Sequence, residues 1–341
     1  MERRDFLKFV GATAGAAALS QADILAALAP AAIQETVAGM PRRVLGRTGR
    51  SVSIIGFPGL ALSQKEYDQA RCTKALHDAF ANGLNYFDVA PAYGRGLCET
   101  RMGIGLQGLD RTQYFLACKT NKRDREGSLR ELEHSLTELK TDHFDLYQLH
   151  HLRTHEEVKQ VLGPKGALET FAKAREQGKV KHLGFSAHTT VAALEAMKGF
   201  QFDSVMFPIN FVEFFLHGFG KEVMELANQQ GAGLISIKPL SHGSWPQGAA
   251  RPREWWYRCT ETDQEVARAI RWTLSLKGLV AGIPPSWLDL VEKAIKAAKS
   301  YQPATENDVA ELRQLASSCL PLFNEAEGQA ELDYPNCPYS V

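Results

Sequence analysis

The sequence predicts an α/β fold in which short strands and amphipathic helices alternate eight times after residue 41. The expected strands are continuous apolar runs, as is typical of strands that are buried on both faces. Between them, apolar residues recur at helical spacing, most clearly as leucine at positions 129, 132, 136 and 139. Most intervals between runs are about thirty residues, which is the length of one βα unit. Eight such units, with no break for a second core, predict a (β/α)8 TIM barrel.

The eight expected strands follow one another along the chain. They are Val52–Phe57, Leu84–Val89, Tyr114–Cys118, Phe144–Leu149, His182–Ser186, Ser204–Ile209, Gly233–Ile237 and Leu279–Ile283. Gly83, Gly178 and Gly231 each stand just before a run, where a glycine commonly ends a helix. The competing fold is a doubly wound open sheet, which would carry G-x-G-x-x-G after its first strand. Residues 56–60, GFPGL, lack that motif, so the barrel is preferred.

Composition restricts the classes of partner. The chain has 39 Lys and Arg residues against 39 Asp and Glu residues, so its balance of charge does not favour a nucleic-acid backbone. Its six cysteines form no C-x-x-C pair, which argues against a zinc ribbon or an iron–sulfur module. We therefore expect a small-molecule partner, no nucleic acid and no metal site.

The N-terminal residues have the pattern of an export signal. Arg3 and Arg4 precede Phe-Leu-Lys and an Ala/Gly-rich apolar run that ends near Leu19, which resembles a twin-arginine signal. Gln21 and Asp23 interrupt the run, so no stable transmembrane span is expected. The sequence thus predicts export to the periplasm by the twin-arginine machinery. The alternative is a short amphipathic helix with an incidental arginine pair on a cytoplasmic protein.

These predictions divide the chain into three parts. Residues 1–38 are the export signal and linker, with cleavage expected between Ala29 and Ala38; residues 41–325 form the barrel; residues 326–341 form an irregular C-terminal tail. Within the barrel, the longest connection without a helical pattern is Ser241–Thr262, which we expect over the mouth of the barrel. Its tryptophans at 245, 255 and 256 either stack on a sugar ring or aromatic carbonyl or pack the loop itself.

Ionisable side chains cluster at the predicted carboxyl ends of three consecutive strands, the end of a barrel where active sites lie. The second strand leads to Asp88 and Tyr93, the third to Lys119, and the fourth to His150 and His151. Singly, each has a structural explanation: a turn cap, a surface aromatic, an extended lysine or a core histidine. Their joint placement on neighbouring strands favours a catalytic group.

This set of side chains suits the reduction of a carbonyl by hydride transfer. The carbonyl oxygen gains negative charge and needs a proton. Tyr93 can supply it, and an ammonium at Lys119 is expected to lower the tyrosine pKa from its usual value of about 10. Asp88 can keep a buried Lys119 charged. His150 can donate a hydrogen bond to the carbonyl oxygen and orient the substrate.

From about residue 43 to residue 297 the chain resembles the aldo-keto reductases. The resemblance rests on LGRTG at 45–49, FDVAPAYG at 87–94, CKT at 118–120 and DLYQLH at 145–150. It implies a barrel closed below by an N-terminal hairpin, here Arg43–Ser53, and gives Asp88, Tyr93, Lys119 and His150 the family's catalytic roles. It also implies an NADP cofactor, with NAD as the alternative, and a small carbonyl or alcohol substrate. His151 falls one place beyond the family's histidine and is expected to line the pocket.

The resemblance also points to a set of cofactor-binding residues near the later strands. They are Ser186, Asn210, Lys238, Pro239, Leu240, Ile283, Ser286 and Glu292. For Leu240 and Ile283, ordinary barrel packing is almost as good an explanation.

The nicotinamide side of the pattern departs from the family. The segment GFSAH at 184–188 keeps the family's serine but loses its asparagine. Met206 and Ile209 stand where the family has a glutamine and a stacking aromatic, so neither the amide hydrogen bond nor the π face is available there. Nicotinamide must then be held differently, by Phe211 or His188, or held weakly. Pro285 stands where some members carry a lysine for the 2′-phosphate.

Two other functions remain as alternatives. The altered nicotinamide pocket suggests a barrel that binds nucleotide with little turnover and acts as a sensor or partner subunit. A metal-dependent hydrolase is suggested by ten histidines and the pair at 150 and 151. Such barrels need ligands on several strands, and the first and last expected strands hold neither histidine nor aspartate.

Overall fold

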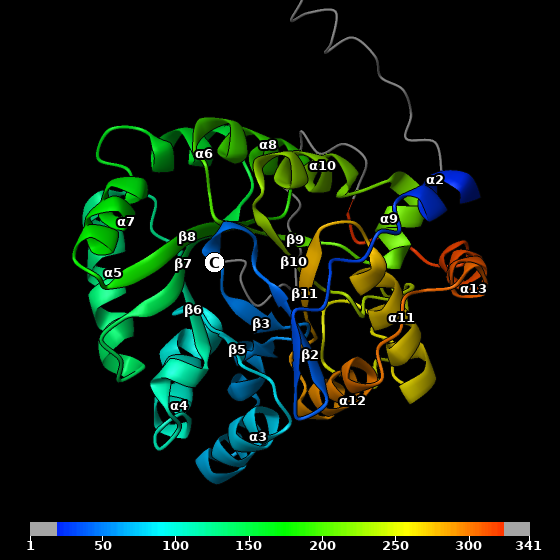
Figure 1. The fold of residues 1–341 in the computed structure, drawn as a ribbon, viewed down its shortest axis with the longest axis horizontal. Coiled ribbons are helices and arrows are strands. Elements are labelled where there is room, and N and C mark those ends of the chain that lie inside the picture. The colour runs from blue at the N-terminus through cyan, green and yellow to red at the C-terminus, as the bar shows by residue number, and fades with distance from the viewer. Residues whose placement is uncertain (1–18, 324–341) are drawn as a thin grey trace, which may run out of the picture.

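In the computed structural model, which describes residues 19–323, eight parallel strands form a nearly closed barrel inside a ring of helices (Figure 1). The strands are β4 (Phe57–Pro58), β5 (Tyr86–Asp88), β6 (Phe115–Thr120), β7 (Phe144–Leu152), β8 (Val180–Ala187), β9 (Ser204–Pro208), β10 (Gly233–Ile237) and β11 (Leu279–Ile283). Each pairs with its neighbour in chain order. The barrel closes where Gly56 N donates to Gly282 O at 3.0 Å and Gly282 N donates to Ile54 O at 2.9 Å.

The helices cover the outside of this barrel. They are α2 (Gln21–Ala26), α3 (Gln69–Ala81), α4 (Leu97–Gly105), α5 (Arg125–Glu138), α6 (His155–Leu162), α7 (Ala167–Glu176), α8 (Thr190–Gly199), α9 (Phe211–His217), α10 (Lys221–Gln230), α11 (Asp263–Ser275), α12 (Leu288–Lys299) and α13 (Glu306–Ala316). Several begin with a capping box, such as Thr262 with Glu265 at α11. The predicted (β/α)8 barrel is therefore confirmed.

A small antiparallel sheet covers the lower end of the barrel, as the predicted hairpin required. It consists of β1 (Glu35–Val37), β2 (Met40–Val44) and β3 (Ser51–Ser53). The predicted first barrel strand, Val52–Phe57, is wrong in its bounds, because its first two residues belong to β3 and the barrel strand itself is β4. One apolar run covers both elements since both are buried, and hydrophobicity alone does not separate them.

The barrel interior is packed by inward-facing side chains. Leu45 and Val52 rise from the lower sheet, and above them lie apolar side chains of the barrel strands, which include Tyr86, Phe115, Ala117, Leu146, Met206, Ile235, Val280, Ala281 and Ile283. A second, larger cluster fills the space between the strands and the helices. Because these side chains fill the barrel axis, the place in this fold where a ligand meets the strands is their carboxyl end.

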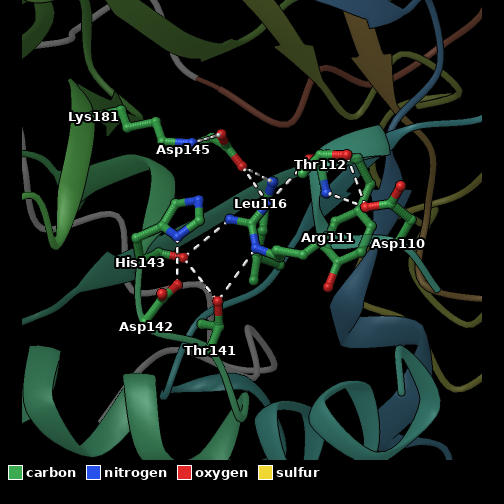
Figure 2. A network of polar contacts seen from close by, with 10 residues as sticks. Asp110, Arg111, Thr112, Leu116, Thr141, Asp142, His143, Asp145 and Lys181 are labelled. Carbon is green, nitrogen blue, oxygen red and sulfur yellow. Dashed lines mark hydrogen bonds and ion pairs between the residues drawn. The ribbon is translucent and has the colours of Figure 1, made fainter. Parts of the chain in front are cut away.

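A polar network ties three strands together at their amino ends (Figure 2). Asp145, at the start of β7, is almost fully buried and accepts from Arg111 Nη1 at 2.8 Å, Leu116 N at 3.0 Å and Lys181 Nζ at 3.3 Å. These partners belong to the segment before β6, to β6 and to β8. Asp145, which the family motif includes, thus holds the barrel at the end opposite to the predicted active site.

The residues just after the apolar leader pack on the barrel. The side chain of Ile24 in α2 is fully buried, and α2 contacts α13 (Figure 1). Ala29 N donates to Ser275 O and Lys277 N donates to Ala27 O, both at 2.9 Å. Residues 19–38, assigned above to signal and linker, therefore hold defined positions on the barrel, and its small sheet begins before residue 41.

The predicted arginine pair and the C-terminal tail after residue 323 lie outside the described residues. Within residues 19–323, no helix combines the length and the hydropathy that a membrane span requires.

Candidate active site

A buried ion pair lies at the floor of the barrel mouth. Lys119 of β6 donates to Asp88 of β5 and to Val89 O, the latter at 3.2 Å, and both charged side chains are almost completely buried. Gln148 Nε2 and the Tyr86 hydroxyl approach Asp88 Oδ2 at 3.4 and 3.5 Å. The carboxylate is thus held from three neighbouring strands, and it offsets the charge that burial would otherwise disfavour on Lys119.

Tyr93 lies beside this pair on the turn that follows β5. The Lys119 Nζ atom is 5.1 Å from the centre of the Tyr93 ring, and the ammonium also hydrogen bonds to the phenol. After Tyr93 the backbone takes three left-handed residues, Gly94, Arg95 and Gly96, with φ of 58°, 55° and 90°. Glycine adopts this conformation at little cost, so the two glycines allow the sharp turn that presents Tyr93 at the mouth.

Burial and the neighbouring charges act in opposite directions on the pKa values of Lys119 and Asp88. Burial lowers the pKa of Lys119, but Asp88 and Tyr93 raise it more, so its pKa stays above the ordinary value and the amine is an ammonium. Burial raises the pKa of Asp88, and Lys119 opposes that rise.

Burial raises the pKa of Tyr93 to about 12, and the charge and hydrogen bond of Lys119 offset only part of this rise. The expected net lowering of this pKa is therefore wrong. Desolvation of a phenolate outweighs one ammonium whose charge is already opposed by Asp88. Lys119 still favours the phenolate relative to a site without it, and Tyr93 holds its proton at neutral pH.

His150 completes the group from the end of β7. Its ring packs edge-on to Tyr93 with centroids 5.5 Å apart, and it is almost fully buried. Burial, and next the charge of Lys119, hold the pKa of His150 well below its usual value, so the imidazole is neutral. Arg123 Nη1 donates to the His150 carbonyl at 2.8 Å, and Arg123 is itself fixed by an ion pair with Glu157 at 2.9 Å. The hydrogen bond from Arg123 therefore fixes the backbone of His150, which carries the ring.

These side chains lie at one end of a cavity that opens to solvent at the mouth. The cavity extends from Tyr93 and His150 past the ends of β8 and β10 to residues 283–286 after β11. A concave mouth lined by apolar side chains and a few polar groups is the usual setting of a small-molecule or cofactor site.

The loop after β10 forms an aromatic wall over the cavity. Trp255, Trp256 and Tyr257 line it, whereas the Trp245 indole donates to Trp255 O at 2.8 Å and does not line it. Trp245 thus packs the loop, as one of the two alternatives stated, and Trp255 and Trp256 lie where a ligand could contact them.

An arginine fastens this loop to the barrel. Arg253 forms ion pairs with Glu261 at 2.8 Å and with Asp289, in the first turn of α12, at 2.6 Å. Its guanidinium also lies 5.1 Å from the centre of the Trp287 ring. Sequence reasoning missed Arg253, because its two partners are distant in the chain or lie within a loop that has no periodicity.

Half of the predicted cofactor residues line the cavity. They are Ser186, Lys238, Ile283 and Ser286. Ser186 Oγ accepts a hydrogen bond from His151 N at 2.7 Å, and Lys238 Nζ lies 5.3 Å from the centre of the Trp256 ring. His151 also lines the cavity, as expected.

The other four predicted cofactor residues lie elsewhere. Asn210 caps α9, where its Oδ1 accepts from Val212 N at 3.0 Å, and it is fully buried. Leu240 belongs to the hydrophobic core, and Pro239 packs against Gly282. Glu292 lines a separate groove between α3 and α12 on the outside of the barrel. These four assignments came from motif spacing, which does not show which way a side chain points.

Phe211, one of the two side chains proposed above to replace the family's nicotinamide contacts, is fully buried and does not line the cavity. His188, the other, does line it. Gln148 and Tyr86 were missed as partners of Asp88. Alternation along a strand gives a signal for both, since each is two residues from an inward-facing member of the group, His150 or Asp88.

Within residues 19–323, no three histidine, cysteine or acidic side chains come together in a way that could hold a metal ion. The histidines at the mouth lie beside Lys238, whose Nζ is 3.4 Å from His188 Nε2. An ammonium at that distance competes with a cation for the imidazole lone pair. This arrangement gives the metal-dependent hydrolase no support in the described part of the chain.

Comparison with known proteins agrees with this geometry. The sequence model of the aldo/keto reductase family matches residues 54–318, which is most of the chain. The chain belongs to the aldo/keto reductase family. The match covers all eight barrel strands and therefore includes every residue of the site described above.

Individual relatives of this aldo/keto reductase are distant. Over 179 residues it is 28% identical to the uncharacterized oxidoreductase YqkF of Bacillus subtilis, covering 49% of this chain and 55% of that protein. Over 157 residues it is 29% identical to L-galactose dehydrogenase of Arabidopsis thaliana, covering 42% and 47%. The chain thus spans about half the length of these curated relatives.

Among solved structures, the aldo-keto reductase AKR11C1 of Bacillus halodurans in its holo form superposes with a TM-score of 0.68. The superposition covers 85% of this chain and 99% of that one at 21% identity. At this identity the likeness bears on the fold alone, and it agrees with the nearly closed barrel described above.

Proposed function

We propose that this chain is an NAD(P)H-dependent oxidoreductase that reduces the carbonyl of an aldehyde, a ketone or a sugar. The observation that carries the proposal is the buried Lys119–Asp88 pair beside Tyr93 and His150, at the end of the cavity in the barrel mouth. A buried cation next to a phenol has a chemical use where the phenol must give up a proton.

The four side chains have separate roles in this proposal. Tyr93 is protonated at neutral pH, because burial raises its pKa to about 12, and it donates the proton to the carbonyl oxygen. Lys119 stabilises the phenolate that remains, and Asp88 keeps Lys119 charged. His150, a neutral imidazole, donates a hydrogen bond that orients the carbonyl. A nicotinamide cofactor, when bound, supplies the hydride.

The residues of the cavity suit such a cofactor. The cavity reaches from the Tyr93 hydroxyl end to Ser286 after the last strand, and Lys238 brings a positive charge to its wall. Buried polar atoms without a described partner, such as His188 Nδ1 and His151 Nε2, also lie on lining residues. Polar atoms buried in a cavity without a partner are expected where a ligand provides one. We propose NADP as the cofactor, with NAD as the alternative.

Turnover of NADPH with a panel of aldehydes, ketones and sugars tests the proposal. We expect a loss of NADPH absorbance that depends on the carbonyl. We expect Tyr93→Phe to lower the rate by a factor of about 10² to 10⁴, the usual contribution of a positioned acid.

Binding of NADPH to Tyr93→Phe is measured in parallel and should be unchanged. Nucleotide binding without turnover above the Tyr93→Phe level, across the whole panel, would instead favour the second candidate, a nucleotide-binding barrel that acts as a sensor or partner subunit. The loss of an amide side chain at Ala187 and Met206 is the observation that keeps this candidate in view.

We also propose that the N-terminal residues direct export by the twin-arginine machinery to the periplasm. The support is the order of Arg3, Arg4 and the apolar run that follows. Replacing both arginines by lysine should retain a tagged chain in the cytoplasm, which cell fractionation measures. An unchanged distribution between the compartments would favour a cytoplasmic protein whose arginine pair is incidental.

A further inference from the structure

A histidine in the wall of the mouth cavity has a buried polar atom with no partner in the described chain. His188 follows the end of β8, lines the cavity and is only 8% exposed. Its Nε2 lies 3.4 Å from Lys238 Nζ, and its Nδ1 has no hydrogen-bond partner. The ring itself is fixed, because it packs edge-on against His151 with centroids 4.0 Å apart.

The lysine decides which nitrogen of His188 carries the proton. An ammonium only donates hydrogen bonds, so the Nε2 atom next to Lys238 must accept. A neutral imidazole has one acceptor and one donor, which makes Nδ1 the donor. Burial, together with His151 and Lys238, keeps the pKa of His188 well below its usual value, so the ring is neutral. This lining residue therefore holds a buried N–H group that has no acceptor among the described residues.

The surroundings of His188 restrict the ligand group. Ser186 lies two residues earlier in β8, on the same face of the sheet, and its Oγ already accepts from His151 N at 2.7 Å. Its hydroxyl proton is thus available to donate. Met206, which pairs with Ser186 across β8 and β9, has a thioether and no donor. Two residues with a donor to spare, Ser186 at the end of β8 and His188 just after it, therefore line the cavity that Tyr93 and His150 also line.

We propose that His188 positions the cofactor by donating from Nδ1 to the carboxamide oxygen of nicotinamide. This inference rests on the proposed function. The nicotinamide ring must lie near Tyr93 and His150 for hydride transfer, and the end of β8 forms the adjacent wall of the same cavity. His188 thereby takes over the polar contact that Ala187 and Met206 cannot make. His188 is a positioning residue, since the proton that it holds is not transferred.

The test compares two ligands that differ only in the nicotinamide half. NADPH and 2′-phospho-ADP-ribose, which lacks nicotinamide, are titrated by quenching of tryptophan fluorescence, because Trp255 and Trp256 line the cavity. The variant is His188→Phe, which keeps an aromatic ring for packing but has no N–H. We expect it to weaken NADPH binding by about three- to tenfold, the effect of one hydrogen bond, and to leave 2′-phospho-ADP-ribose unchanged.

Two further comparisons extend the test, with a second variant and with a second cofactor analogue. His188→Asn returns an amide donor and should bind NADPH much as the wild type does. The wild type should bind thionicotinamide NADPH, in which sulfur replaces the carboxamide oxygen, more weakly than NADPH. His188→Phe should lose this preference, and thermal unfolding checks that each variant is folded.

The outcomes separate the two proposals. Equal weakening of NADPH and 2′-phospho-ADP-ribose by His188→Phe would mean that His188 only packs the cavity wall, and the inference would be overturned while the proposed function stands. The inference about His188 would also be overturned, and the proposed function would stand, if the wild type bound NADPH and thionicotinamide NADPH equally well. A wild type that binds neither these nucleotides nor NADH and ADP-ribose, the matched pair without the 2′-phosphate, would overturn both.

Discussion

Lys119 is the residue on which the chemistry of the site depends most. It is fully buried, and its ammonium contacts Asp88 while it lies near the ring of Tyr93. A buried ion pair of this kind is weak support for stability, because the desolvation of both charges offsets their attraction. The presence of Lys119 in the barrel core is better explained by the proton transfer that we propose for Tyr93 than by stability.

Removing one charge of this pair should be more harmful than removing both. We expect Lys119→Met to lower the free energy of unfolding by about 3–5 kcal/mol, because Asp88 is left buried without its cation. Lys119→Met with Asp88→Asn should recover part of that loss. Urea denaturation of the two variants and of Lys122→Met, an exposed neighbour, measures this. A double variant no more stable than the single one would show that the pair itself stabilises the fold.

His151 is expected to make the free energy of unfolding depend on pH. Burial, and next the charge of Arg153, lower its pKa to about 3. Between that value and the unfolded pKa of about 6.5, the unfolded chain binds a proton that the folded chain does not, so stability falls as the pH falls. From about pH 7.5 to about pH 5 we expect His151 to account for roughly 2 kcal/mol of lost stability.

Urea denaturation of wild type and His151→Gln at these two pH values measures that contribution. The variant should lose about 2 kcal/mol less than the wild type on acidification. His134→Gln, at an exposed histidine, is the matched control variant. Identical losses in wild type and His151→Gln would mean that the buried imidazole is already protonated in the folded chain.

At the scale of secondary-structure elements, Asp145 joins β6, β7 and β8 at their amino ends (Figure 2). Burial acts to raise the pKa of this carboxyl, but Arg111, Leu116 N and Lys181 lower it, and the net pKa is below its usual value. Its contribution to stability is therefore present above the unfolded pKa of about 4 and is lost as the pH falls through the lower folded value.

We expect Asp145→Asn to lower the free energy of unfolding by about 2–3 kcal/mol, because charge-assisted hydrogen bonds to two cations are weakened. Asp142→Asn is the matched control: it belongs to the same network, but its side chain is 91% exposed, and it should change stability little. Urea denaturation at neutral pH compares the two variants. Equal effects would indicate that the partners of Asp145 contribute nothing beyond surface ion pairs.

The elements also show where sequence reasoning succeeded. Seven of the eight barrel strands were predicted close to their observed places, because strands buried on both faces are continuous apolar runs. The first failed since β3 and β4 share one such run. Motif spacing did not show that Asn210 caps α9 or that Glu292, inside α12, lines an outer groove, because both follow from helix geometry.

At the scale of the whole molecule, the segment before the small sheet is part of the barrel's packing. Deleting residues 1–29 would remove Ile24 and the backbone hydrogen bonds at Ala27 and Ala29. We expect this to lower the free energy of unfolding by about 2–4 kcal/mol relative to a chain that lacks residues 1–18 alone. Urea denaturation of the two proteins measures the difference. Equal stability of the two would show that α2 adds nothing to the fold.

This expectation bears on the proposed export. Cleavage between Ala29 and Ala38, as the sequence predicts, would remove α2 from the mature barrel. The intact mass of the purified protein therefore reports which residues remain, and its stability shows whether the loss of α2 is tolerated.

The sequence predicted the fold and the members of the group at the mouth, because strand order alone brings Asp88, Lys119 and His150 to one rim. It did not predict the net pKa of Tyr93, which depends on how deeply the ring is buried. It did not find the Arg253 contacts either, since these join a loop to a distant helix. The sequence did not predict these two features because they depend on burial and on contacts between residues that are distant in the chain.

The transfer of deuterium tests the central claim most directly. NADPH that carries deuterium at the transferable position of nicotinamide C4 is incubated with the wild-type protein and a carbonyl compound that it reduces. The alcohol that forms is examined by mass spectrometry. We expect one deuterium on the former carbonyl carbon with wild type, and almost none in the same time with Tyr93→Phe. Equal incorporation by the two proteins would contradict Tyr93 as the acid, and none with wild type would contradict hydride transfer altogether.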